Sequence, residues 1–177
     1  MVKFISQILS AKALLFQERL MVGEVSRVLI DPKDGALVGI EIKGENEEEV
    51  RYIPPTEIKG FGNGLVLIKD LNSLSTADEV IKIKEVLDQK IEIIKSKVYF
   101  EDGRYLGRVD DATINLKIST LEKIYVNPRL STKFFSECLI ISAKSIVKIE
   151  PKKITIKDDR VKSKKSILSP VVAPITE

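Results

Sequence analysis

The chain has 177 residues, a length that fits one domain or two small ones. Hydrophobic residues make up 44% and charged residues 31%, and the net charge of +3 is below the strongly basic balance typical of nucleic-acid-binding proteins. The sequence has no histidine and one cysteine, which excludes the commonest general base, an intramolecular disulfide and a thiolate zinc site within one chain.

Residues 1–70 predict a first unit of short strands separated by turn residues. The predicted strands span 14–16, 22–31, 36–42, 50–53 and 65–68. The sequence Asp31-Pro32-Lys33-Asp34-Gly35 favours a turn, because proline presets φ and glycine accepts a positive φ. The strands on either side of it are therefore expected to form a hairpin. The glycine-rich run 60–64 is expected to be a flexible turn.

Residues 71–90 predict a linker that contains a helix. Thr76 and Glu79 have the spacing of a capping box, and Val80, Ile83 and Val86 follow at helical spacing. We expect a helix of about three turns over 77–89. The alternative is a bridging strand, because residues 81 and 83 are both β-branched isoleucines.

Residues 91–158 predict a second unit that repeats the first. A glycine and a fixed apolar pattern occur 84 residues apart, as Gly23-x-Val25-x-x-Val28-x-Ile30 and Gly107-x-Val109-x-x-Ala112-x-Ile114. Residues 98–100 match 14–16 at this offset, and four extra residues within 127–137 raise the later offset to 88. A shared order over this length indicates one small fold built twice. The tail, 159–177, has no clear period and is expected to be disordered.

The inward-facing positions change parity at the same place in both units. Val25 stands at an odd position and Val28 at an even one, and the equivalent change falls between Val109 and Ala112. A regular strand alternates strictly, so each unit is expected to contain a β-bulge at this point. Bulges bend strands and favour closure of a small sheet into a barrel.

These segments resemble the PRC-barrel family. The resemblance rests on V-G-E-V-S-R-V-L-I-D-P-K-D-G at 22–35, on Y-L-G-R-V-D-D-A-T-I-N at 105–115 and on the strands that follow each. The family includes the cytoplasmic domain of the photosynthetic reaction-centre H subunit and the C-terminal domain of a ribosome-maturation factor. The resemblance implies an all-β fold of two tandem small PRC-type β-barrels joined by a short α-helix. It also implies an interaction platform, and it carries no catalytic residue.

The remaining chemistry of the sequence is sparse. Asp110 and Asp111 are adjacent on a predicted strand, so their side chains should point to opposite faces and not share one site. The acidic run 47–49 is expected to be a solvated loop, and Cys138, in an apolar run, a buried small hydrophobic side chain. We therefore expect a protein that is not an enzyme, with no catalytic, cofactor-binding or metal-binding residues.

Two segments are candidates for binding a partner. The long loop of the second unit and the basic cluster of the tail supply the candidate residues Arg129, Lys133, Phe134, Phe135, Lys162, Lys164 and Lys165. One phenylalanine could instead cap the barrel, and the tail could be a solubilising terminus. We expect a cytoplasmic adaptor that binds a protein of unknown identity.

Two other readings of the sequence compete with the adaptor. The first is a ribosome- or RNA-associated factor, by analogy with the maturation factor. The second is peripheral membrane attachment, for which the lysine cluster of the tail is small. No apolar run approaches the roughly 20 residues that span a bilayer, so no integral membrane segment is expected. Ser6 and Gln7 interrupt the apolar start before it reaches the length of a secretory signal.

Overall fold

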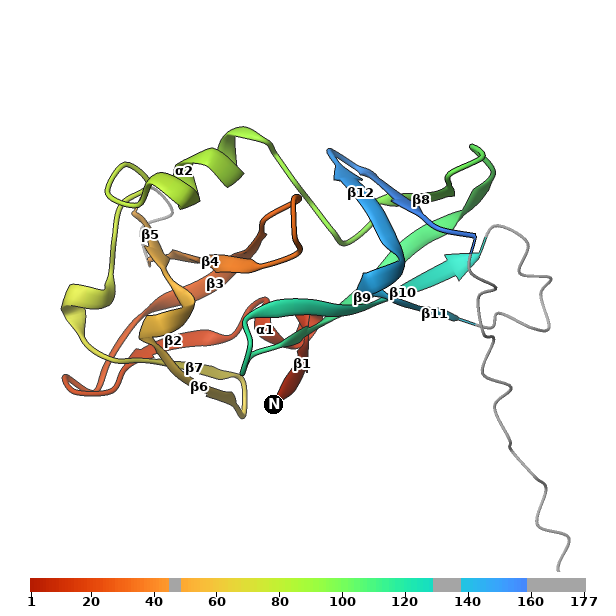
Figure 1. The fold of residues 1–177 in the computed structure, drawn as a ribbon. Helices are drawn as coiled ribbons and strands as arrows, with labels where there is room; N and C mark the ends of the chain where they lie inside the picture. Colours follow the sequence, from red (N-terminus) through yellow and green to blue (C-terminus); the bar gives the residue numbers. More distant parts are fainter. Residues whose placement is uncertain (45–48, 129–137, 159–177) are drawn as a thin grey trace, which may run out of the picture.

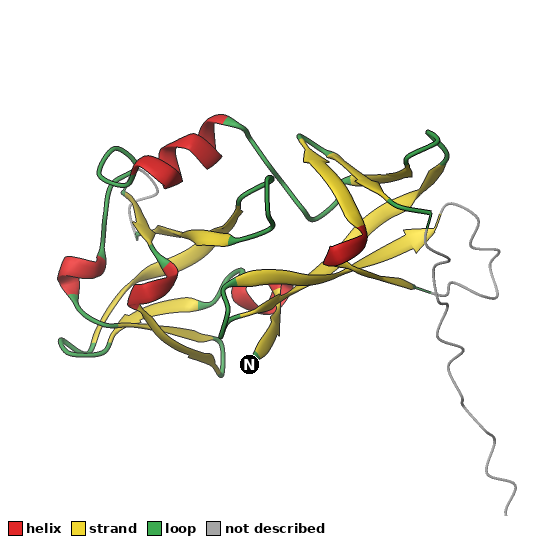
Figure 2. Cartoon of the chain, viewed as in Figure 1, coloured by secondary structure: helices red, strands yellow, loops and turns green. Residues whose placement is uncertain are grey.

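A computed structural model of the chain describes residues 1–44, 49–128 and 138–158. Within these residues the protein is mainly β, with two mixed sheets and two short helices (Figure 1, Figure 2). The expectation of a β-rich fold is therefore confirmed. The expected tail, 159–177, lies outside the described residues.

Six strands of the first unit form one sheet, in the order β5-β4-β3-β2-β7-β6. Neighbouring strands are antiparallel except β2 and β7, which are parallel. Their bounds are β2 Lys12–Leu15, β3 Leu20–Ile30, β4 Leu37–Lys43, β5 Val50–Ile53, β6 Ile58–Gly62 and β7 Leu65–Ile68. Strand β6 occupies most of the glycine-rich run predicted to be a turn, so that prediction was wrong except at residues 63–64.

The second sheet repeats this order as β11-β10-β9-β8-β13-β12, again with one parallel pair, β8 and β13. A short 3₁₀ turn precedes β6 in the first unit, at Pro55–Glu57, and β12 in the second, at Ala143–Ser145. The strands are β8 Lys97–Phe100, β9 Tyr105–Asn115, β10 Thr120–Pro128, β11 Leu139–Ser142, β12 Ile146–Glu150 and β13 Lys153–Ile156. Both halves of the chain therefore have the same topology.

The strand registers correct one detail of the repeat. Ala13 of β2 lies opposite Gly23, and Val98 of β8 lies opposite Gly107. Ala13 and Val98 are 85 residues apart, because the turn that follows is one residue shorter in the second unit. The matching of 98–100 with 14–16 was therefore wrong by one residue.

Each repeated glycine lies where two backbones approach closely. A Cβ atom at Gly23 would lie 2.0 Å from the carbonyl oxygen of Lys43, and one at Gly107 would lie 2.1 Å from that of Asn127. Gly23 also has a φ of +137°, a conformation that side chains with a Cβ rarely adopt. The repeated glycine thus allows the backbones of neighbouring strands to approach closely in both units.

The predicted bulges are present in both units. Between β3 and β4 the register shifts between Val25 and Arg27, and between β9 and β10 it skips Asp110. The closure expected from them is not seen in the strand pairing of the described residues. The two edge strands of each sheet are not paired with each other in the strand order: β5 and β6 in the first sheet, β11 and β12 in the second.

The linker helix is shorter than predicted, since α2 spans Ile81–Asp88. Its N-cap is Val80, and the expected capping residues form a turn ahead of it, in which the Thr76 N–H donates to Glu79 Oε2 at 2.6 Å. Ile83 and Val86 are buried and pack, with Leu29, Val38 and Tyr52, in a small separate cluster. The helix therefore covers one face of the first sheet.

The two units share one hydrophobic core and exchange backbone pairing. Near the chain start, β1 (Val2–Phe4) pairs with β9 of the second sheet, and α1 (Ile5–Ile8) follows it; the sequence pattern did not predict either element. At the hairpin ends, the Leu37 N–H donates to Ser119 O and the Leu121 N–H donates to Gly35 O, both at 2.8 Å. These two bonds join equivalent positions, so the contact is nearly two-fold symmetric. No helix in the described ranges is long and apolar enough to cross a membrane.

Candidate functional site

The structure does not place the residues that the sequence singled out for binding. Arg129, Lys133, Phe134, Phe135, Lys162, Lys164 and Lys165 all lie outside the described residues.

The turn between β2 and β3 carries an exposed apolar patch. The side chains of Phe16, Leu20, Met21 and Leu71 are 64%, 53%, 44% and 56% exposed, and we call these four residues the hairpin patch. Phe16 and Leu20 flank the turn. Met21 and Leu71 line one pocket, and Phe16 lines a neighbouring hollow with Leu67 of β7. The Leu71 N–H donates to Glu18 Oε1 at 3.2 Å, which fixes Leu71 beside the turn. Large apolar side chains gathered on a surface typically mark a contact site.

The second unit shows that this fold does not require an apolar turn. Glu101 occupies the position of Phe16. The Phe16 N–H donates to Ile68 O at the end of β7, and the Glu101 N–H donates to Ile156 O at the end of β13. The turn continues with Asp102 and Arg104, which bond each other. The backbone N–H of Arg104, and then its guanidinium, hold the pKa of Asp102 below its usual value.

Sequence reasoning missed the hairpin patch. Residues 17–19 are polar and were interpreted as an ordinary turn, although Phe16 and Leu20 flank them. The available signal was the contrast with Glu101 in the second unit. A misaligned repeat concealed that contrast, because it placed Phe16 against Phe100.

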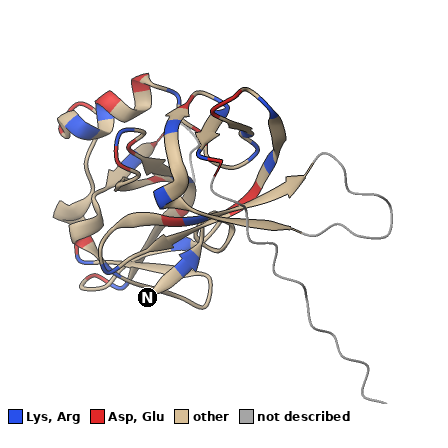
Figure 3. Cartoon of the chain, turned by 45° about the vertical axis from the view of Figure 1, so that its right-hand side comes forward, with Lys and Arg blue, Asp and Glu red and all other residues tan. Residues whose placement is uncertain are grey.

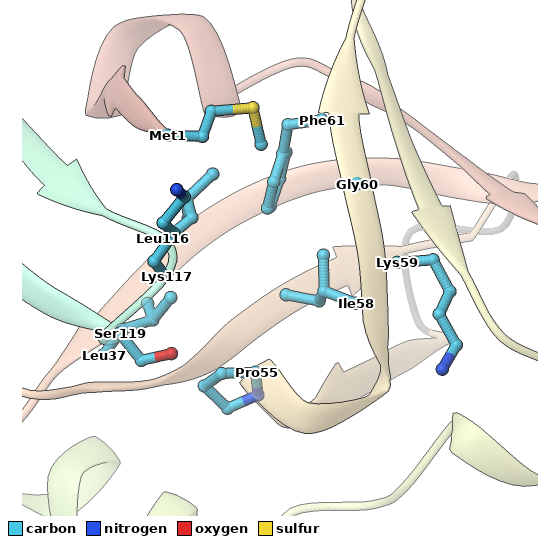
Figure 4. A pocket seen from close by; sticks show the side chains of 10 residues that line it. All are labelled: Met1, Leu37, Pro55, Ile58, Lys59, Gly60, Phe61, Leu116, Lys117 and Ser119. Carbon is cyan, nitrogen blue, oxygen red and sulfur yellow. The ribbon is translucent and has the colours of Figure 1, made fainter.

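A pocket of about 130 Å³ lies where the two units meet (Figure 4). Ile58 and Phe61 of β6 project into it from one side, and Leu116 of the β9–β10 turn lies on the other. Lys59 points away, on the far side of β6 (Figure 4). Its volume is close to that of an engineered cavity that holds one benzene. The pocket can therefore accept one apolar side chain, with Lys117 at its border.

The buried carboxylate of the first sheet is fully engaged in structural contacts. Glu41 is 4% exposed and accepts hydrogen bonds from the Ser26 hydroxyl at 2.7 Å and the Tyr52 hydroxyl at 3.2 Å. Arg27 lies 3.7 Å from the same carboxylate. Burial, and then the Glu41 charge, raise the pKa of Tyr52. The network holds β3, β4 and β5 together under the helix.

A second buried carboxylate attaches the helix to the first unit. Asp31 accepts from the Lys33 N–H at 2.9 Å and lies 3.1 Å from the Lys82 ammonium of α2. Burial alone would raise the pKa of Asp31, but the Lys33 N–H and the Lys82 charge outweigh it and lower the pKa below its ordinary value. This ion pair stabilises the position of α2.

The remaining sequence candidates for chemistry lie on β9 and just before β11. Asp111 accepts hydrogen bonds from the backbone and hydroxyl of Ser6, while Asp110 occupies the bulge. Cys138 is exposed, so the prediction of a buried thiol was wrong. It directly precedes β11, near Val126 of β10. Desolvation and then the Asp110 charge raise the pKa of this thiol.

Within the described ranges, no group of three or more acidic or Cys side chains is placed to hold a metal ion. Comparison with known proteins adds no family assignment. No family model matches the chain, and no curated protein matches it.

Proposed function

We propose that this protein is a non-enzymatic adaptor, built from two PRC-type units, that binds a protein partner through the hairpin patch. The observation that carries the proposal is the set of exposed apolar residues around the β2–β3 turn, where the second unit has the charged Glu101 in place of Phe16. The common strand order and the paired bulges support the PRC-type architecture. A cytoplasmic location and the absence of a cofactor are parts of the same proposal.

The charges around the hairpin patch favour a protein over a membrane surface. Its rim carries Glu18 and Arg19 in the turn, Lys59 of β6, Lys69 just after β7, and Asp70, 3.6 Å from the Lys69 ammonium. Anionic lipid attracts clusters of cations, and this rim mixes cations with carboxylates. An apolar centre with a mixed polar rim is the usual anatomy of a protein interface.

The energetic centre of such an interface is a large side chain that becomes fully buried. Phe16 is the most exposed member of the patch, and burial of an aromatic anchor of this kind often dominates affinity. The partner is therefore expected to present an apolar surface or pocket to Phe16. A second copy of this chain could also cover the hairpin patch, so the experiment must distinguish self-association from binding of another protein.

The test uses Phe16→Glu, which installs the residue type that the second unit has at the equivalent position and should leave the fold intact. Ile81→Glu is the matched control, because Ile81 is 77% exposed but lies on α2. Tagged wild type and both variants are expressed at native level, and co-purifying proteins are quantified. Proteins lost with Phe16→Glu but kept with Ile81→Glu support the proposal. A Phe16-dependent dimer in light scattering, with no such protein, would assign the patch to self-association and overturn the adaptor function.

The alternative function, association with RNA or the ribosome, is favoured by a separate observation. The outer face of the second sheet carries a row of cations beside two tyrosines that the first sheet lacks. These residues are distinct from those of the hairpin patch.

A further inference from the structure

Three cations lie side by side across the second sheet. Lys153 of β13 pairs with Lys97 of β8, and Lys97 pairs with Arg108 of β9. All three are exposed, whereas Val98 and Ile154, their neighbours along the strands, are buried. Paired residues on adjacent strands share a face of the sheet and stand about 5 Å apart. We call these three residues the cation row.

The first unit has no such row at the equivalent positions. There, Lys12 pairs with Leu65 on one side and with Glu24 on the other, and Glu24 pairs in turn with Lys43. Opposite charges therefore alternate across the first sheet. Like charges placed directly opposite each other destabilise a sheet. The cation row therefore destabilises the second unit, whereas the first unit has the same fold without this repulsion.

Two tyrosines form the next row of the same face. Tyr99 pairs with Tyr105, and their ring centres lie 5.2 Å apart. The Lys153 ammonium lies 5.6 Å from the centre of the Tyr99 ring. In the first unit the equivalent pair is Leu14 and Met21, which is apolar without being aromatic. The two sheets have therefore diverged together at the aromatic row and at the cation row.

We propose that this face of the second sheet binds single-stranded nucleic acid. The phosphates lie along the cation row, and the bases stack on Tyr99 and Tyr105. Single strands are bound in this way elsewhere, with cations that follow the backbone and aromatic rings that stack on bases whatever their sequence. The proposal does not depend on the hairpin patch, so an adaptor with no nucleic-acid affinity and a nucleic-acid binder with no protein partner are distinguishable outcomes.

Positive charge gathers on this face. Acidic and basic residues are mixed over the rest of the described chain (Figure 3), and the net charge of the sequence is only +3. Glu150 borders the row; its carboxylate lies 2.7 Å from the Lys148 ammonium and 3.8 Å from that of Lys153, so its charge is shared between two lysines. An acidic peptide could bind the three cations, but it would leave the tyrosine pair unused. The tyrosines favour a ligand with flat rings.

Fluorescence anisotropy with labelled oligonucleotides tests the proposal on the full chain. The probes are oligouridine and oligothymidine of about ten nucleotides, within the usual site size of one small β domain. The difference in affinity between the two probes shows whether the face prefers RNA or DNA. A glutamate-rich peptide of similar length is the third probe. With three phosphate contacts, log affinity should fall with log salt at a slope of about −2.

The variants replace each residue by the one that the first unit has. Tyr99→Leu with Tyr105→Met should weaken binding about tenfold or more, through lost stacking. Arg108→Glu should weaken it further and reduce the salt slope by about one. Lys12→Glu is the matched control, because it removes the equivalent lysine from the other sheet, and it should leave affinity unchanged.

Two results would overturn the proposal. One is binding of the glutamate-rich peptide as tight as that of the oligonucleotides and insensitive to the tyrosine replacements, which would assign the face to acidic proteins. The other is equal loss of oligonucleotide binding in Lys12→Glu and Arg108→Glu, which would show only a diffuse charge effect. Unchanged melting temperatures of the tyrosine variants confirm that a loss of binding is not a loss of fold.

Discussion

Reversal of one charge in the cation row gives a prediction that requires no ligand. Arg108 lies opposite Lys97, and Arg108→Glu creates there the same pairing that Glu24 makes with Lys12 in the first unit. A repulsive cross-strand pair becomes an attractive one. The folded protein should therefore become more stable while, by the inference above, it loses affinity for nucleic acid.

The expected gain follows from the geometry of the pair. Cross-strand charge pairs contribute about 0.2–1 kcal/mol each, favourable for opposite charges and unfavourable for like charges. The change removes one and adds the other, but both side chains are exposed and screened by solvent, so the net gain is roughly 1 kcal/mol. For a chain of this length that corresponds to a rise of about 2–4 °C in melting temperature. At about 1 M salt the screening length falls to about 3 Å and most of the gain should disappear.

Thermal and urea unfolding at low and high salt measure the effect. Glu24→Arg is the reciprocal variant, because it puts a cation between Lys12 and Lys43. It turns two attractive cross-strand pairs into repulsive ones, where Arg108→Glu changes one pair, so it should destabilise by roughly 2 kcal/mol, again only at low salt. A lower melting temperature for Arg108→Glu at low salt, or a rise that high salt leaves unchanged, would refute the reasoning.

Three further predictions concern the fold. Gly23→Ala and Gly107→Ala should each cost about 3 kcal/mol or more in urea unfolding, because the added Cβ meets a carbonyl oxygen at 2.0 or 2.1 Å; Gly60→Ala, with nothing within 4 Å, should stay within about 1 kcal/mol. Asp31→Asn should lower the unfolding free energy by about 1 kcal/mol at neutral pH. The pKa of Asp31 is lowered in the folded state, so its contribution is fully present above the unfolded value of about 4, and the difference from wild type should shrink as pH falls below that value and vanish below the lowered folded pKa. Ile83→Ala should cost about 2–5 kcal/mol and speed hydrogen exchange in α2.

The features of the fold that could be predicted from sequence are those with a local physical cause. The repeated glycines mark close backbone approaches, and the parity changes near Ser26 and Asp110 mark bulges, so each leaves a trace in the residue pattern. Those traces identified the duplication and most of the strands. The inference from bulge to closed barrel did not follow, because a bulge bends a strand but does not pair the two edges of its sheet.

The features that could not be predicted depend on contacts between distant segments. Strand β1 has three residues, too few to show a period, and it forms because β9 offers a free edge. Strand β6 contains two glycines, which disfavour a strand, and it forms because its backbone pairs with β7 in antiparallel register. The cation row is invisible in the sequence, since Lys97, Arg108 and Lys153 are far apart until three strands pair. The hairpin patch required the correct register of the repeat, which the sequence alone did not supply.

The most direct measurement of the adaptor function is a quantitative comparison of the proteins that co-purify with wild type, Phe16→Glu and Ile81→Glu at native expression. The account predicts at least one stoichiometric protein that is retained by wild type and Ile81→Glu and lost with Phe16→Glu, at unchanged melting temperature. Identical sets of co-purifying proteins from all three chains would contradict it.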